Sequence, residues 1–401
     1  MQAFYIMSRF YSYLNTTASI LEQYKGETPL AVFLKQFFAA NKKYGSKDRR
    51  QIASLCYDYF RLGHTLKDMP LEEKLLTATF LCENQPSVLL ENLRPEWNSL
   101  IGETLAVKKT NIGESFNEAD IFPFVNDLSE GMDQTAFAAS FLHQPKLFLR
   151  LRPGQENLVK AKLKAISMPF ENMGKNAIAL ANGARADEEI VIDKEAVIQD
   201  YNSQQIGELL RPLMGVQNTG TASRFPIQVW DCCAASGGKS IMLYDLNPNI
   251  RLLVSDIRQS ILHNLQNRFQ RAGIQQYQKF VVDLAAEEVS LPMGNKFNMI
   301  LADVPCTGSG TWARTPEQLY FFNSETITTY AERQRKIISH VIPRLQNGGH
   351  LVYITCSVFK QENEETVNAI VKEHGVELVS QQLLKGYHDF ADTMFLAVLK
   401  K

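Results

Sequence analysis

The feature that most constrains the fold of this chain is a repeated order of strand, loop and helix after residue 225. Five short apolar segments with strand character alternate there with segments whose apolar residues have helical spacing. Such alternation predicts a parallel sheet covered by helices, with ligands bound at the carboxyl ends of the strands. The five predicted strands read IQVWD, RLLVSD, KFVVD, FNMILAD and HLVYITC.

Two regions of different character precede this one. Residues 1–130 have helical periodicity, which predicts an all-α bundle. Within it we expect Gly45 to end one helix and Ser46 to cap the next. Residues 131–215 mix strand-like KLFLRLRP, AIALA and EEIVID with helix-like ENLVKAKLKAI, which indicates a small α+β module. The sequence therefore predicts three domains, at 1–130, 131–215 and 216–401.

Composition and charge exclude several classes of protein. The formal net charge is −1, so a nucleic-acid partner would have to bind a local basic patch. The chain has no apolar run long enough for a membrane span and no signal-peptide pattern at its start. The six cysteines form no CxxC pair, which favours a reducing cytoplasm. The seven histidines have no metal-ligand spacing, so we predict no metal site.

A glycine-containing loop follows the first predicted strand and opens a helix. This loop, DCCAASGGKS at 231–240, contains Gly237 and Gly238, which allow a ligand to approach the backbone closely. The amino terminus of the helix offers free N–H groups to an anion. The loop matches neither the phosphate-binding loop of nucleoside triphosphatases nor the dinucleotide fingerprint G-x-G-x-x-G, so both of those classes are poorly supported.

Aspartate residues end the next three predicted strands, at Asp256, Asp283 and Asp303. One such residue is most simply explained by turn formation. Three of them behind a glycine loop favour a nucleoside-binding edge. Asp256 lies about twenty residues after Gly237, where an acid that binds ribose hydroxyls is expected.

Two cysteines follow the fourth and fifth predicted strands. Cys306 lies in ADVPCTGSGT and Cys356 in YITCSVFKQENEETV, so both face the crevice of a doubly wound sheet. A reactive thiolate needs stabilisation, and the positive end of a helix opening near Glu362 could supply it. We interpret the remaining cysteines as packing residues, with Cys232 and Cys233 beside the ligand loop.

The three motifs together resemble the RNA cytosine-5 methyltransferases of the RsmB/Nop2/Sun family. The resemblance covers nearly the whole chain. YGSKDRRQIASLCYDYFR is similar to the NusB-like domain of the bacterial 16S rRNA members, and AVIQDYNSQQ is similar to the family's Val-Gln-Asp-x-x-Ser-Gln segment. The chain departs from the family at Ser236, where proline is usual, and in TWARTPE after Cys306. The resemblance implies an all-α NusB-like domain, a small RRM-like α+β linking module and a Rossmann-like S-adenosylmethionine-dependent methyltransferase domain.

The resemblance also implies S-adenosylmethionine as the methyl donor. It implies that Asp256 binds the ribose hydroxyls, that Asp283 binds the adenine amine and that the loop at 232–238 binds the methionine portion. The residues implied in cofactor binding are Cys232, Cys233, Ala234, Ala235, Ser236, Gly237, Gly238, Lys239, Asp256, Arg258, Asp283 and Asp303.

For the chemistry, the resemblance implies covalent catalysis on cytosine. Cys356 would attack C6, and Cys306 would assist release of the product. Asp303 would bind the N3/N4 edge of the base, and Lys239 would orient Asp303 or the base. DNA cytosine-5 methyltransferases attack from the Pro-Cys motif instead, so exchanged cysteine roles are the alternative.

The partner implied is RNA, with 16S rRNA or a small-subunit assembly intermediate first. We expect a cytoplasmic monomer without a membrane partner. An enzyme acting on tRNA or DNA is one alternative, and a non-catalytic RNA-binding or ribosome assembly factor is another. Intact Asp303, Cys306 and Cys356 favour an enzyme. Candidate RNA contacts are Lys42, Lys43, Lys47, Arg49, Arg50, Arg150 and Arg152.

Overall fold

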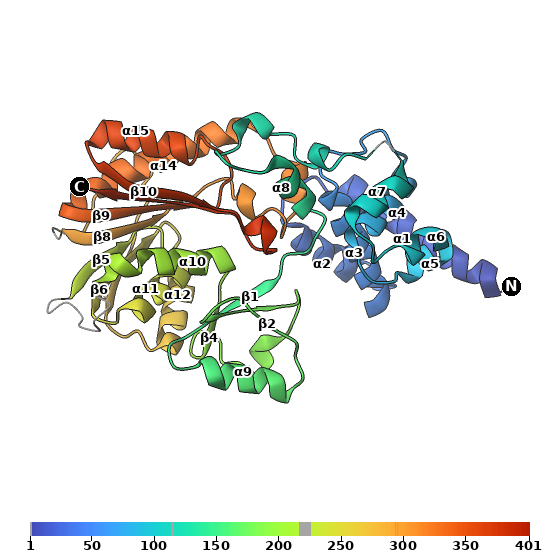
Figure 1. Ribbon diagram of the computed structural model, residues 1–401, viewed down its shortest axis with the longest axis horizontal. Helices are drawn as coiled ribbons and strands as arrows, with labels where there is room; N and C mark the ends of the chain where they lie inside the picture. Colours follow the sequence, from blue (N-terminus) through green and yellow to red (C-terminus); the bar gives the residue numbers. More distant parts are fainter. Residues whose placement is uncertain (1, 114–115, 216–225, 293, 295) are drawn as a thin grey trace. The chain divides into compact units, whose positions relative to one another are not determined.

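The computed structural model describes residues 2–113, 116–215, 226–292, 294 and 296–401 (Figure 1). The chain forms two compact units. Unit 1 comprises Met1–Asn126, Met132–Gln144 and Trp312–Asn323, and unit 2 comprises Asp127–Gly131, Pro145–Thr311 and Ser324–Lys401. The three-domain division stays a prediction, and its boundary at residue 216 lies outside the described residues.

Unit 1 is helical and encloses an apolar core that includes Leu55, Phe60 and Phe80. The segment Trp312–Asn323 belongs to it: Leu30 donates its backbone N–H to Glu317 at 3.1 Å. Its helices are α1 (Gln2–Gln23), α2 (Leu30–Ala40), α3 (Ser46–Arg61), α4 (Leu71–Cys82), α5 (Val88–Leu93), α6 (Pro95–Ser99), α7 (Leu105–Ile112), α8 (Gln134–Ser140), α13 (Glu317–Tyr320) and the 3₁₀ turn η1 (Glu118–Ile121). No described helix in either unit is long and apolar enough to cross a membrane.

The expected helix caps at Gly45 and Ser46 are wrong. Helix α2 ends at Ala40 with Asn41 as its C-cap, and Gly45 is the N-cap of α3, with Ser46 as the first helical residue. The carboxylate of Asp48 accepts the Gly45 N–H at 3.0 Å. A carboxylate is a stronger acceptor than a serine hydroxyl and is favoured at the positive end of a helix, so Asp48 satisfies this end of α3.

Unit 2 contains a small antiparallel sheet with the strand order β2-β3-β1-β4. The expected strand EEIVID is wrong: this segment starts at the last residue of the 3₁₀ turn η3 (Ala186–Glu188) and forms one isolated bridge at Ile192. Asp193 has φ +70°, which breaks an extended strand. The elements here are β1 (Leu147–Leu151), α9 (Glu156–Ala165), β2 (Glu171–Asn172), β3 (Ala177–Leu180), β4 (Ala196–Ile198), α10 (Tyr201–Leu210) and η4 (Arg211–Met214).

The main sheet of unit 2 has seven strands in the order β10-β11-β9-β8-β5-β6-β7 (Figure 1). The five expected strands form and pair in parallel, but β11 runs antiparallel to both β9 and β10. The expectation of a wholly parallel sheet is therefore wrong at one edge. Its strands are β5 (Ile227–Asp231), β6 (Ile250–Asp256), β7 (Tyr277–Val281), β8 (Phe297–Asp303), β9 (Leu345–Thr355), β10 (Glu377–Leu384) and β11 (Met394–Lys400).

Helices cover both faces of this sheet. One apolar core joins it to α10, α11 (Gly238–Leu246) and α12 (Gln259–Ala272), and a second joins it to α14 (Glu325–Val341) and α15 (Glu364–His374). Successive residues of β8 enter opposite cores: Met299 and Leu301 enter the first, and Ile300 and Ala302 enter the second. Because both faces are covered, the carboxyl edge of the parallel strands is the part of the sheet open to a ligand.

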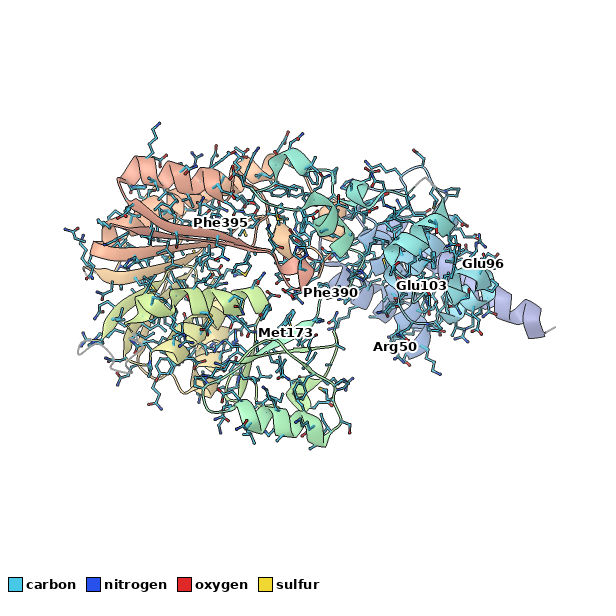
Figure 2. All side chains as sticks on the ribbon, in the orientation of Figure 1. Arg50, Glu96, Glu103, Met173, Phe390 and Phe395 are labelled. Carbon is cyan, nitrogen blue, oxygen red and sulfur yellow. The ribbon has the colours of Figure 1, made fainter. Side chains whose placement is uncertain are left out.

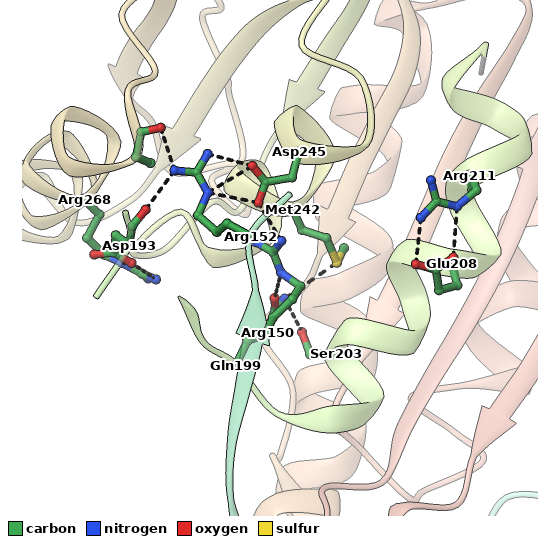
Figure 3. A network of polar contacts seen from close by, with 11 residues as sticks. Arg150, Arg152, Asp193, Gln199, Ser203, Glu208, Arg211, Met242, Asp245 and Arg268 are labelled. Carbon is green, nitrogen blue, oxygen red and sulfur yellow. Dashed lines mark hydrogen bonds and ion pairs between the residues drawn. The ribbon is translucent and has the colours of Figure 1, made fainter. Parts of the chain in front are cut away.

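The two arginines of β1 and its exit are not RNA contacts, contrary to expectation (Figure 3). Arg150 donates to Asp245 of α11 at 2.6 Å and to Gln199 at 2.7 Å. Arg152 donates to Asp245 at 2.7 Å and to the carbonyl of Ala272 at 2.7 Å. Their side chains are only 9% and 12% exposed, so both charges are used inside unit 2. Such buried pairs fasten the small sheet to α11 and α12.

Candidate active site

The glycine loop makes a constrained turn between β5 and α11. Gly237 has φ +84°, and a Cβ atom there would lie 2.7 Å from a ring carbon of Phe269, so only glycine fits. Ala235 has φ +44°, a conformation that costs a non-glycine residue about 1–3 kcal/mol. Its N–H donates to Asp256 at 3.0 Å. The strained turn therefore fastens the loop to the end of β6.

Ser236, which replaces the usual proline of the family, is held by a hydrogen bond. Arg268 of α12 donates to the Ser236 hydroxyl at 2.9 Å and to its carbonyl at 3.2 Å. The same guanidinium forms an ion pair with Asp193 at 2.8 Å. These contacts restrain the loop where a proline ring would do so. Sequence reasoning did not find this pair, because Asp193 and Arg268 lie far apart in the chain.

A pocket of about 380 Å³ opens beside the loop, within the size range of small-molecule sites. Asp256 is 8% exposed and accepts hydrogen bonds from Ala235 and from the N–H of Arg258 at 3.0 Å. Its carboxylate is thereby fixed, and it keeps lone pairs for further donors. The predicted residues that line the pocket are Cys232, Cys233, Ala235, Asp256, Arg258, Asp283 and Asp303.

Five other predicted residues do not line the pocket. Ala234, Ser236, Gly237, Gly238 and Lys239 shape the turn and the start of α11. Sequence reasoning missed the residues Ile257, Val282, Leu284, Pro305, Arg333 and Ile337, which line the pocket. Ile257, Val282 and Leu284 adjoin the predicted acids and could have been inferred. Arg333 and Ile337 come from α14, and no local signal indicates them.

The two predicted cysteines lie together. The Sγ atoms of Cys306 and Cys356 are 3.3 Å apart, although strands β8 and β9 position them separately. The backbone N–H of Gly310 donates to the carbonyl of Cys356 at 2.8 Å. A Cβ atom at Gly310 would lie 2.0 Å from the carbonyl of Thr393, so glycine permits this close approach.

Three ionisable side chains near the two thiols are Lys239, Asp303 and Glu362. Lys239 donates to Asp303 at 2.7 Å. Burial lowers the pKa of Lys239, but Asp303 and Cys356 outweigh it and raise that pKa overall. The hydrogen bond with Cys356 and burial raise the pKa of Cys306, and Glu362 adds to the increase. The raised pKa of Cys306 favours its protonated form.

The helix expected to open near Glu362 is present. Helix α15 begins at Glu364, and Glu362 is a fully buried loop residue. Its carboxylate accepts hydrogen bonds from Thr307, Ser357 and Gln334. This carboxylate adds to the increase in the pKa of Cys306 that the Cys356 hydrogen bond and burial cause.

We predict a pH-dependent stability contribution from Asp231, which is 1% exposed at the end of β5. Burial raises its pKa from 3.8 to about 7, and the hydrogen bond from Ser240 opposes this increase. The native state holds the Asp231 proton more tightly than the unfolded state does. The contribution of this carboxyl group to the free energy of unfolding is therefore full below pH 4 and is lost as the pH rises through 7. The loss amounts to roughly 4 kcal/mol.

Thermal unfolding of wild-type protein and Asp231→Asn, from pH 5 to pH 8, checks this prediction. Asparagine can accept the same Ser240 hydrogen bond without a charge. The melting temperature of the variant should gain on that of the wild type as the pH rises. Parallel pH profiles would contradict the prediction.

Comparison with known proteins identifies the family of this site. Residues 226–394 match the family model described as 16S rRNA methyltransferase RsmB/F. These residues therefore form a methyltransferase domain of the RsmB/F family. A ribosomal RNA small subunit methyltransferase B from Shewanella oneidensis is 30% identical over 223 residues, which are 53% of this chain and 49% of that protein. The matched region thus spans about half the length of this curated relative.

Two solved structures have a similar fold. The crystal structure of PH0851 has a TM-score of 0.67 at 18% identity and covers 95% of this chain and 96% of that chain. A methyltransferase homologue from Pyrococcus horikoshii has a TM-score of 0.54 at 21% identity and covers 68% of this chain and 92% of that chain. The main sheet of unit 2 and its helices are therefore a Rossmann-like methyltransferase fold.

S-adenosylmethionine is the methyl donor of this family, and the pocket fits it. The fixed carboxylate of Asp256 can accept ribose hydroxyls, and Asp283 lies in the same wall. Ile257 and Leu284 offer apolar surface for a purine ring. The bound cofactor would supply an electrophilic methyl group. Among the described residues, no group of three His, Cys, Asp or Glu side chains is placed to hold a metal ion.

Proposed function

We propose that this protein transfers a methyl group from S-adenosylmethionine to C5 of a cytosine in RNA, with 16S rRNA as the first candidate. The observation that carries the proposal is the pair of thiols 3.3 Å apart, with Lys239 and Asp303 in an ion pair beside the cofactor pocket. The name of the Shewanella relative supports ribosomal RNA of the small subunit as the substrate.

In this proposal, the chemistry begins with addition of the Cys356 thiolate to C6 of cytosine. A carbon–sulfur bond forms, and the electron pair of the C5–C6 double bond becomes available at C5. Asp303 binds the N3/N4 edge of the base. S-adenosylmethionine would supply the methyl group to C5, with the electron pair of the broken S–CH3 bond left on the donor sulfur, and a base then removes the C5 proton. The electrons of that C–H bond restore the C5–C6 double bond. The C6–S bond breaks, and its electron pair returns to the sulfur of Cys356.

Each cysteine has a separate role in the proposed reaction. Lys239 is close enough to Cys356 for the thiol to raise its pKa, and a nearby cation favours a thiolate. Cys306 is the protonated partner at 3.3 Å, placed to assist product release. A flipped or unpaired cytosine is required, since C6 is inaccessible in a stacked helix.

The other regions of the chain would hold the RNA. We infer that unit 1 is the NusB-like domain and that the small sheet of unit 2 is the RRM-like module. Lys42, Lys43, Lys47 and Arg50 are exposed on unit 1, and we propose them as phosphate contacts. Figure 2 labels Arg50. Arg49 is partly buried and donates to the carbonyl of Tyr44 at 2.8 Å. A cytoplasmic monomer fits this proposal.

Incubation of the purified protein with methyl-labelled S-adenosylmethionine and either 16S rRNA or tRNA tests the function. We expect label in 16S rRNA and a single protected cytosine after bisulfite sequencing. Label only in tRNA would favour the alternative substrate. Failure to bind S-adenosylmethionine in calorimetry would favour a non-catalytic assembly factor.

A further inference from the structure

Helix α14 supplies part of the cofactor pocket. Arg333 and Ile337 both line the pocket, and they lie about one helical turn apart, so they share one face of α14. Ile337 and Leu284 belong to the same apolar core. The Nδ1 of His340 donates to the carbonyl of Leu284 at 2.9 Å. These contacts fasten α14 to the loop that follows β7, where Asp283 lies.

A second hollow of about 690 Å³, which we call the outer groove, adjoins the cofactor pocket. It is lined by polar residues of α14 from Thr329 to Ser339, by Asp283 and Ala285, and by Glu373. Asp283 and Arg333 line both the outer groove and the cofactor pocket. These two side chains therefore form the boundary between the two hollows.

Arg333 has no partner within the described part of the chain. Its side chain is half-buried, and it forms no hydrogen bond or ion pair with any described residue. A guanidinium group carries five N–H donors, and burial of such donors without an acceptor costs free energy. Arg258, the other arginine in the pocket wall, is 59% exposed and contacts Asp256 at 3.4 Å. The donors of Arg333 are thus available to a ligand in the pocket.

The adenine ring of the cofactor suits this position. The carboxylate of Asp283 accepts the N–H of Ala285 at 2.9 Å and keeps lone pairs for an amine. A planar guanidinium stacks on the face of an aromatic ring, and adenine offers both a face and an amine. S-adenosylmethionine also carries a carboxylate, which a guanidinium could bind. Asp283 in the same wall would repel that carboxylate, so the adenine is favoured beside Arg333.

We propose that Arg333 is a cofactor-binding residue that stacks on the adenine ring of S-adenosylmethionine and closes the cofactor pocket toward the outer groove. This inference rests on the proposed function only for the identity of the cofactor. Neither RNA nor methyl transfer enters it, so it can be measured as cofactor binding alone.

Calorimetric titration of the full chain with S-adenosylmethionine and with its decarboxylated form tests the proposal. Arg333→Met keeps an extended side chain but removes the charge and the donors. The Kd should rise about tenfold for both ligands, because both contain adenine. A rise for S-adenosylmethionine alone would mean that Arg333 binds the carboxylate, which would overturn the proposal. Unchanged Kd values for both ligands would overturn it as well.

Arg335→Met is the matched control for the loss of one positive charge from α14. Arg335 lies two residues further along the helix, is also half-buried, and lines the outer groove but not the cofactor pocket. This variant should bind both ligands with the Kd of the wild type. An increase in Kd as large as that of Arg333→Met would show a general effect of charge, and the proposal would fail.

A gain of binding distinguishes the proposed role from a loosened fold. Arg333→Ala should join the cofactor pocket to the outer groove, so that the groove can receive a group attached to the adenine amine. We expect N6-benzyl-S-adenosylhomocysteine to bind this variant about tenfold more tightly than the wild type, whereas S-adenosylhomocysteine binds it more weakly. Equal losses for the two ligands would contradict the proposal.

The same titrations separate this inference from the proposed function. If the wild type binds S-adenosylmethionine and the Arg333 variants bind all ligands as the wild type does, this inference alone fails. If the wild type does not bind S-adenosylmethionine, the proposed function and this inference fail together.

Discussion

Replacement of Cys356 by serine should reduce methyl incorporation into RNA by roughly four orders of magnitude or more. Serine matches the size of cysteine, but its hydroxyl does not ionise near neutral pH, so no anionic nucleophile can add to C6. The measurement is the rate of labelled methyl transfer to 16S rRNA under single-turnover conditions. Binding of S-adenosylmethionine should not change, because Cys356 does not line the pocket.

Cys82→Ser is the control for the loss of a thiol. Cys82 ends α4 in unit 1 and interacts weakly with the carbonyl of Asp58 at 4.0 Å. This variant should methylate RNA at the rate of the wild type. Methyl transfer by Cys356→Ser at the same rate would exclude a covalent intermediate on Cys356.

Replacement of Cys306 by alanine should trap the enzyme on its substrate. Cys356 can still form the carbon–sulfur bond, but the group that assists release is absent, so the covalent complex accumulates. Incubation with RNA and S-adenosylmethionine should yield a protein–RNA adduct that survives denaturant. We expect most of the active enzyme in this adduct, compared with a few per cent or less for the wild type.

The double variant Cys306→Ala and Cys356→Ala tests the origin of that adduct. It should form none, because neither thiol remains at the end of β8 or β9. An adduct that forms with the single variant Cys356→Ala, and not with Cys306→Ala, would exchange the two roles.

The elements that carry the proposed chemistry could be predicted from local sequence. The strands that end at Asp231, Asp256 and Asp303 form as expected, because apolar residues on both faces suit a strand buried between two helical layers. The glycine loop follows from the same order of strand and helix. A parallel sheet then places successive strand ends on one edge, so the aspartates and the cysteines could be expected to meet there.

Long-range contacts decided what local sequence could not. The sequence around Arg150 indicates an exposed RNA contact. In the structure Arg150 is buried against Asp245, which lies 95 residues away in the chain. The antiparallel pairing of β11 depends on the hairpin that returns from β10, and not on the apolar pattern of either strand.

The sequence by itself determined the strands, the glycine loop and the positions of the two thiols along the chain, because these depend on local patterns and on short loops. Only the tertiary structure decided that Glu362 accepts hydrogen bonds from Thr307 and Ser357 and that Lys239 pairs with Asp303. The state of a thiol depends on the charges and burial around it, and distant segments supply both when the chain folds.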